Sequence, residues 1–76
     1  MTELDWLDAF GDNLVYMMKS SNVTQRELSC FTGLSESAIS SYINKRKIPG
    51  IKAIINIADA LECTVSELID YGDRIE

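Results

Sequence analysis

The chain has 76 residues, of which 46% are hydrophobic, and a net charge of −5 at pH 7. This length suits a single small domain spanning residues 1–76 and leaves no room for a second, catalytic domain. No apolar run approaches the roughly 20 residues that cross a bilayer, and no basic-then-apolar leader opens the chain, so we expect a cytoplasmic protein that does not contact a membrane.

The residue types also argue against enzymatic and metal chemistry. The chain has no histidine, and its two cysteines, Cys30 and Cys63, lie 33 positions apart. This excludes the usual zinc spacings and any histidine acid or base. We expect two free thiols, with Cys63 in the core and Cys30 partly exposed, and no metal, cofactor or enzymatic activity.

Charge is distributed unevenly along the chain. Residues 19–52 carry six basic side chains against Glu27 and Glu36, a balance of +4, whereas the two flanks carry ten acids against Arg74, a balance of −9. Net acidity alone argues against a polyanionic partner, but a basic middle can still face phosphates on one side.

A first amphipathic helix is predicted over residues 4–18. Its apolar side chains recur at steps of three and four residues: Leu4, Leu7, Phe10, Leu14, Met17 and Met18. Polar residues separate them, namely Asp5, Asp8, Asp12 and Asn13. Gly11 weakens this helix modestly and Lys19 ends it. Trp6 lies beside the apolar stripe, where it either covers the core or forms a self-association patch.

A second helix is predicted to begin at Thr24, because Thr24 and Glu27 have the spacing of a capping box. Leu28 and Phe31 form its expected core face, and Val23 is placed to act as a hydrophobic staple. Gly33 supplies the left-handed residue that ends this helix.

A third helix is predicted after Ser35, which is placed to cap it. Ala38, Ile39 and Tyr42 face inward, which leaves an outward face of small polar residues: Glu36, Ser37, Ser40, Ser41 and Asn44. A solvated helix face usually favours Lys and Glu, so three outward serines call for another explanation.

A basic loop, "NKRKIPG", which Pro49 closes, leads to the last two predicted helices. The first of these has an apolar face of Ile51, Ile54, Ile55, Ala58 and Leu61. Thr64 and Glu67 repeat the capping box before a short helix that carries Val65, Leu68 and Ile69. We therefore expect a compact all-α fold of five helices, with a frayed tail over residues 72–76.

The two short helices within residues 24–44, with Gly33 between them, form a helix-turn-helix. In this motif the second helix lies in the major groove of DNA and the first crosses the backbone. Small polar side chains on the exposed face of the second helix suit contact with base edges.

Four stretches, "TQREL", "TGLSESAIS", "NKRKIP" and "ALECTVSEL", resemble the lambda-repressor/Cro-type (XRE) helix-turn-helix family, and the resemblance covers nearly the whole chain. It implies a five-helix lambda-repressor-like domain that binds double-stranded DNA, usually as a homodimer on a pseudo-palindromic operator and usually to repress transcription. It also implies a nucleoid-associated protein. With no ligand domain in the chain, we expect no small-molecule effector.

The matched positions imply individual roles. Base edges are read by Glu36, Ser37 and Ser41, with Ser40 as a weaker candidate. Phosphates are met by Gln25, Arg26, Asn44, Arg46 and Lys47. For dimerisation we expect residues 68–75, from Leu68 to Ile75, or else Trp6.

Several positions depart from the family pattern. Lys45 replaces a frequent glycine, so that either Asn44 takes the left-handed conformation or the third helix continues. Glu62 replaces a second frequent glycine in the same way. Ile43 replaces a frequent polar residue and is expected to be exposed beside the basic loop. Glu36 brings a carboxylate close to phosphates, which repel it.

A protein-interaction module on the same scaffold, antitoxin-like or an anti-repressor, is the alternative function. Net acidity favours this alternative. The clustering of basic residues at the phosphate positions opposes it.

Overall fold

The computed structural model describes residues 3–69, with side chains from Trp6 onward. Within this range it contains five helices and no strand: α1 (Glu3–Ser21), α2 (Gln25–Thr32), α3 (Glu36–Ile43), α4 (Ile51–Ala60) and α5 (Val65–Ile69). The predicted all-α class and the order of the helices are therefore confirmed. The side chains of Leu4 and Asp5, and the tail predicted to fray, lie outside the described residues.

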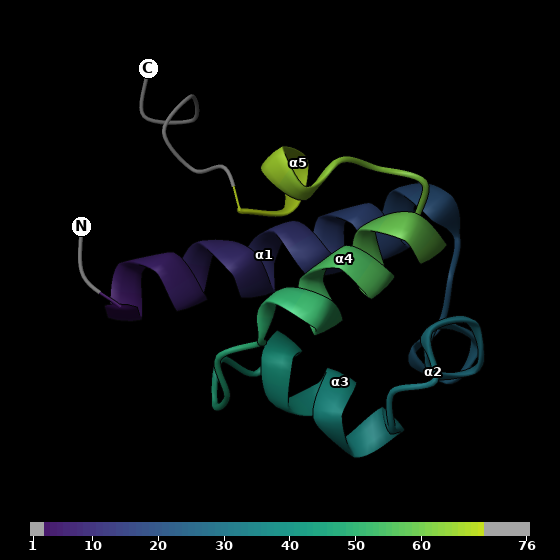
Figure 1. The fold of residues 1–76 in the computed structure, drawn as a ribbon, viewed down its shortest axis with the longest axis horizontal. Coiled ribbons are helices and arrows are strands. Elements are labelled where there is room, and N and C mark those ends of the chain that lie inside the picture. The colour runs from purple at the N-terminus through teal and green to yellow at the C-terminus, as the bar shows by residue number, and fades with distance from the viewer. Residues whose placement is uncertain (1–2, 70–76) are drawn as a thin grey trace.

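The other four helices pack along the long helix α1 or on one another (Figure 1). Helices α2 and α3 lie on one side of it in this view, and α5 lies on the other. Helix α1 packs against α3 and α5, α2 packs against α3 and α4, and α4 packs against α5. None of the helices in the described part of the chain is long and apolar enough to cross a bilayer.

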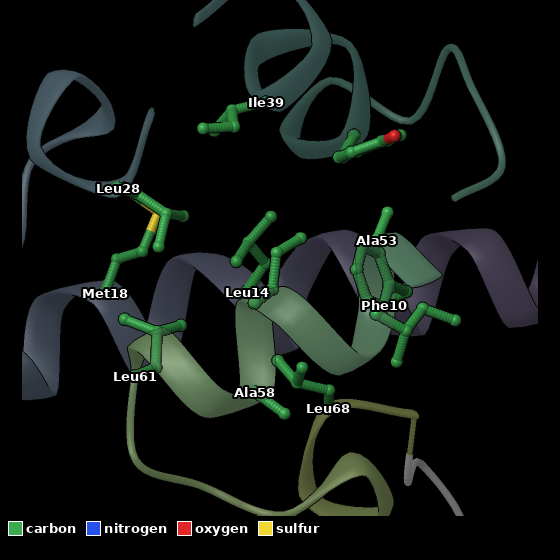
Figure 2. Packing of buried hydrophobic residues seen from close by; sticks show 12 residues of the cluster. Phe10, Leu14, Met18, Leu28, Ile39, Ala53, Ala58, Leu61 and Leu68 are labelled. Atoms are coloured by element: carbon green, nitrogen blue, oxygen red, sulfur yellow. The ribbon is translucent and has the colours of Figure 1, made fainter. Parts of the chain in front are cut away.

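Every helix contributes at least one fully buried side chain to a single core. These side chains are Phe10, Leu14, Leu28, Ile39, Ile57 and Leu68. Figure 2 shows Phe10, Leu14 and Met18 following one another along α1 and pointing into the space between the helices. Burying one such side chain stabilises the fold by about 1.5–3 kcal/mol, so the five helices can hold one another in place without a disulfide. Both cysteines are free: Cys30 is exposed and Cys63 is half-buried against the core.

The predicted helix caps are present. Thr24 Oγ1 accepts from the Glu27 amide at 3.1 Å and Glu27 Oε1 accepts from the Thr24 amide at 2.9 Å, which completes the capping box. Thr64 and Glu67 form the same pair of bonds at 2.8 and 3.1 Å. Gly33 ends α2 with φ of 79°, in the left-handed region.

Trp6 packs against the core, which is one of the two predicted alternatives. Its ring stacks on Phe10, with the ring centroids 5.7 Å apart and the planes at 6°. Phe10 in turn meets the edge of Tyr42 on α3, at 6.2 Å and 84°. This aromatic series joins α1 to α3.

Asn13 was expected on the polar side of α1, but it is 5% exposed. Its Nδ2 donates to the carbonyl oxygen of Leu68 at 2.7 Å, which ties α5 to α1. The expectation was wrong because the short α5 covers this part of α1 and supplies a backbone acceptor that no local pattern reveals.

Three residues assigned to the core are instead exposed: Phe31 (61%), Ile51 (65%) and Ile55 (51%). On α4 the buried stripe consists of Ala53, Ile54, Ile57 and Ala58. At about 100° per residue, Ile51 and Ile55 fall beyond one edge of this stripe. Phe31 lies about 60° around the axis of α2 from the buried Leu28. It therefore falls outside the narrow strip of this eight-residue helix that packs against the core.

Leu68, proposed for a dimer surface, is fully buried and unavailable for contact with a second copy. Residues 70–75 of that predicted surface lie outside the described residues. Ile43 was expected to be exposed, but it is partly buried and packs against the core.

Candidate nucleic-acid interface

The turn between α2 and α3 is held by side chains of α2. Thr32 Oγ1 donates to the Leu28 carbonyl at 2.7 Å and accepts from the Leu34 amide at 3.1 Å. The Ser29 hydroxyl donates to the Leu34 carbonyl. With the left-handed Gly33, these bonds fix the angle at which α3 leaves the turn.

The first turn of α3 is open to solvent on its outward face. Ser35 Oγ accepts from the Ala38 amide at 3.0 Å and so caps the helix, as predicted. Glu36 and Ser37 are exposed, whereas Ile39 and Tyr42 are buried on the opposite side. The structure therefore presents the predicted polar face, with a carboxylate and a hydroxyl at its start.

Further along α3, the candidate residues are less free. Ser40 and Ser41 are partly buried. The Asn44 amide group donates to the Ser40 carbonyl at 2.8 Å and to Ser40 Oγ at 3.2 Å. Ser40 and Asn44 thus bond to each other across one turn of the helix end.

The end of α3 follows neither predicted alternative. Asn44 has φ of −87° and ψ of 7°, and it is Lys45 that takes the left-handed conformation, with φ of 62°. The Lys45 amide donates to the Tyr42 carbonyl at 3.2 Å, and the Arg46 amide donates to the Ser41 carbonyl at 2.8 Å. These two bonds form a Schellman motif, so the backbone behaves as if a glycine were present.

The Lys45 side chain makes a contact that the sequence analysis missed. Its Nζ lies 2.8 Å from Asp8 Oδ1 and 2.9 Å from Asp12 Oδ1, both on α1. Hydrogen bonds to Asp12 and to Asp8 raise the pKa of this ammonium group above its usual value. The one available signal was the unusual lysine at a glycine position, together with two acids a helical turn apart.

The remaining candidate cations are unpaired. Arg26, Arg46 and Lys47 are exposed, and among the described side chains none of them takes part in an ion pair. Gln25 is the exposed first residue of α2. It borders a mainly apolar groove whose other lining residues are Val15, Met18, Lys19, Val23 and Ile43. The start of α2 and the end of α3 therefore line the same groove.

The interface therefore joins two kinds of group. The outward start of α3 offers hydrogen-bonding side chains, and the loop after α3 and the start of α2 offer three free cations and an amide. The acidic flank is not remote from them, because Asp8 and Asp12 reach the end of α3 and engage one of its basic side chains.

Comparison with known proteins agrees with this arrangement. A family model of the Cro/C1-type helix-turn-helix DNA-binding domain matches residues 13–73. No curated protein matches the chain. The crystal structure of the restriction-modification controller protein C.AhdI from Aeromonas hydrophila is similar in fold, with a TM-score of 0.78 and 24% sequence identity over 82% of this chain and 94% of that chain.

The family match includes the second half of α1, both helices of the helix-turn-helix, and the two helices that follow. It covers far more than half of the chain, and the described residues form the five helices that the resemblance implied. The chain therefore belongs to the Cro/C1-type helix-turn-helix family of DNA-binding transcription regulators.

Proposed function

We propose that this protein is a sequence-specific repressor that reads the major groove of duplex DNA with α3. The observation that carries the proposal is the exposed first turn of α3, with Glu36 and Ser37, together with Arg46 and Lys47, which follow the other end of α3 and form no ion pair within the described residues. A helix with small polar side chains fits the groove, and cations at its end meet the phosphates that border it.

Base contacts are assigned by exposure along α3. Glu36 and Ser37 are the leading candidates, and Ser41 and Ser40 follow because they are partly buried. A carboxylate accepts a hydrogen bond from the amino group of cytosine, and a hydroxyl either donates or accepts. Phosphate contacts are assigned to Gln25, Arg26, Asn44, Arg46 and Lys47.

A homodimer on a pseudo-palindromic operator completes the proposal, with α4 as its interface. Ile51 and Ile55 lie one turn apart on α4 and Ile48 lies in the loop just before it; each is between 44% and 65% exposed, and we call these three residues the isoleucine face. A two-fold pairing of α4 centred between Ile55 and Asn56 brings Lys52 of one copy opposite Asp59 of the other, because the two lie equally far from that centre. This self-complementarity of charge around an apolar face supports a second copy as the occupant.

The isoleucine face also suits the placement of α3 on DNA. Ile48 directly follows Arg46 and Lys47, so a two-fold axis at this face holds the basic loops of both copies close to the centre of the operator. The two recognition helices then flank that centre, as half-sites about 34–36 Å apart require.

The proposal is tested by selecting duplexes from a randomised pool at near-physiological salt, with the Glu36→Gln protein in parallel. We expect the wild-type protein to enrich a pseudo-palindrome. Glu36→Gln should change the preference at one symmetric base pair, by about 1–3 kcal/mol, and leave the others as they are. A failure of both proteins to enrich any sequence would overturn the proposal in favour of a protein-interaction module.

A further inference from the structure

The side chain of Lys45 links the end of the recognition helix to α1. Its ammonium group lies between the carboxylates of Asp8 and Asp12, at 2.8 and 2.9 Å. These two acids are four residues apart on α1, so they lie on one face of the helix, one turn from each other. The single ammonium group of Lys45 thus connects two turns of α1 to the segment that ends α3.

The backbone at Lys45 is the second part of the observation. Asn22 and Glu62 are also left-handed, and each follows a helix with the same pair of Schellman bonds. L-residues other than asparagine and aspartate avoid this conformation because Cβ crowds the carbonyl oxygen, which glycine escapes by having no Cβ. Among the three, only Lys45 has an ion pair within the described residues. Only at Lys45, therefore, does a salt bridge to another helix support the left-handed backbone.

Gly11 provides the space for this link. A Cβ added at Gly11 would lie 3.0 Å from Lys45 Cγ and 3.1 Å from the Tyr42 carbonyl oxygen. Glycine therefore lets the lysine stem and the backbone of α3 approach α1 closely, between the two acids. This accounts for a helix-weakening residue in the middle of α1.

We propose that Lys45 is a positioning residue for DNA binding: held by Asp8 and Asp12, it sets the direction in which Arg46 and Lys47 leave α3, and it does not itself contact a phosphate. The proposal rests on the proposed DNA-binding function. We call the group of Lys45, Asp8 and Asp12 the lysine clamp.

The effect of the clamp lies in geometry rather than in stability. Asp8 and Asp12 are 63% and 64% exposed, and ion pairs this open add little to the free energy of folding. The bonds from the Lys45 and Arg46 amides, however, fix the backbone from which Arg46 and Lys47 project. A clamp on Lys45 therefore acts directly on the placement of two phosphate-binding side chains.

A purely electrostatic role gives opposite expectations. If the two acids only repelled DNA, their removal would tighten binding. If Lys45 bound a phosphate, its removal would lower the slope of log K against log salt by about 0.9. In the positioning role, removal of either side of the clamp weakens binding and leaves the slope unchanged.

The test uses four variants of the full chain and a duplex selected by the wild-type protein, with binding measured over a series of salt concentrations that brackets the one where the Debye length is about 8 Å. Lys45→Met removes the ammonium and keeps the stem. Asp8→Asn with Asp12→Asn removes both carboxylates, and a third variant combines all three changes. Thr64→Ala is the stability control, because it removes the cap of α5, which does not pack against α2 or α3.

We expect Lys45→Met and the double aspartate variant each to bind the duplex about 3–10-fold more weakly, with the wild-type salt slope. The triple variant should bind no more weakly than Lys45→Met, because both changes break one link. Thr64→Ala should bind like the wild type at a temperature where it is folded. A lower slope for Lys45→Met, tighter binding by the aspartate variant, or wild-type binding by both overturns the proposal.

Hydrogen exchange of the Arg46 amide without DNA separates the clamp from the proposed function. This amide should exchange faster in Lys45→Met and in the double aspartate variant, but not in Thr64→Ala. Unchanged exchange shows that the clamp does not hold the end of α3 and overturns the inference. If no duplex is ever selected while exchange changes as expected, the DNA-binding function fails and the clamp itself stands.

Discussion

The two ends of α3 are fixed in different ways. At its start, Ser35 caps the helix through a bond to Ala38, three residues away, and the outward side chains are left free. At its end, Lys45 reaches across to Asp8 and Asp12 on α1, more than thirty residues away in the chain. Local bonds alone thus define the part of α3 that we propose reads bases, whereas at the end that presents the proposed phosphate-binding cations a long-range contact adds to the local bonds.

This difference separates what each end contributes to binding. A base contact adds discrimination at one position, whereas a phosphate contact adds affinity for every sequence and makes it salt-dependent. The end of α3 must therefore be held firmly in place without losing its free cations. One lysine is used for the attachment, while Arg46 and Lys47 remain unpaired within the described part of the chain.

The largest effect is expected from Arg46→Ala with Lys47→Ala. Loss of two phosphate contacts should lower affinity for the selected duplex about 10–100-fold at physiological salt and reduce the salt slope by about 2. Binding is measured by fluorescence anisotropy over a salt series. The charge-preserving swap Arg46→Lys with Lys47→Arg is the control and should keep the slope. Equal slopes for the alanine variant and the wild type would show that neither side chain meets a phosphate.

Next in size is the effect of Ile51→Glu on the isoleucine face. A charge in the centre of this face should prevent the second copy from joining, so a duplex with two half-sites should bind about tenfold more weakly while a single half-site binds unchanged. Sedimentation of the complex at high micromolar concentration gives its mass.

Tyr16→Glu is the matched control, because Tyr16 is 66% exposed and Ile51 65%. It adds the same charge on α1 and should leave the dimer intact. If the complex of Ile51→Glu remained dimeric, α4 would not be the dimer interface.

The start of α3 was predictable from the sequence because its determinants are local. Ser35, the capping box of Thr24 and Glu27, and Gly33 act on backbone groups within four residues. The polar face of α3 followed from helical periodicity alone. Candidate base-reading residues could therefore be placed before the structure was known.

The end of α3 and the exposed apolar residues were not predictable in the same way. Whether Ile51 is buried depends on which helix covers its side of α4, and periodicity only says which residues share a side. The contact of Lys45 with α1 depends on the packing of α1 against α3, which brings Gly11 under the lysine stem. Gly11 and Lys45 are each unusual at their positions in the sequence, but only the packing of α1 against α3 shows that they lie against each other.

A smaller effect is expected from Ser35→Ala, which tests the locally fixed end. Loss of the bond from the Ala38 amide should lower the free energy of unfolding by about 1 kcal/mol. Chemical denaturation measures this, with Thr64→Ala as a cap control of the same kind on α5. Because the first turn of α3 carries Glu36 and Ser37, Ser35→Ala should also weaken base discrimination, which Thr64→Ala should not. Equal discrimination in both variants would mean that DNA contact itself orders the first turn.

The smallest effect tests the tethered end through pH. Hydrogen bonds to Asp12 and Asp8 raise the pKa of Lys45 in the folded protein, so the charged form favours folding. That contribution is fully present below the usual lysine pKa of about 10.4 and is lost as the pH rises through the raised value. Unfolding temperatures of the wild type and Lys45→Met, measured from pH 8 to pH 11.5, should therefore differ by a small constant amount and converge only at the alkaline end. A difference that persists unchanged to pH 11.5 would assign the stabilisation to packing of the lysine stem over Gly11 rather than to its charge.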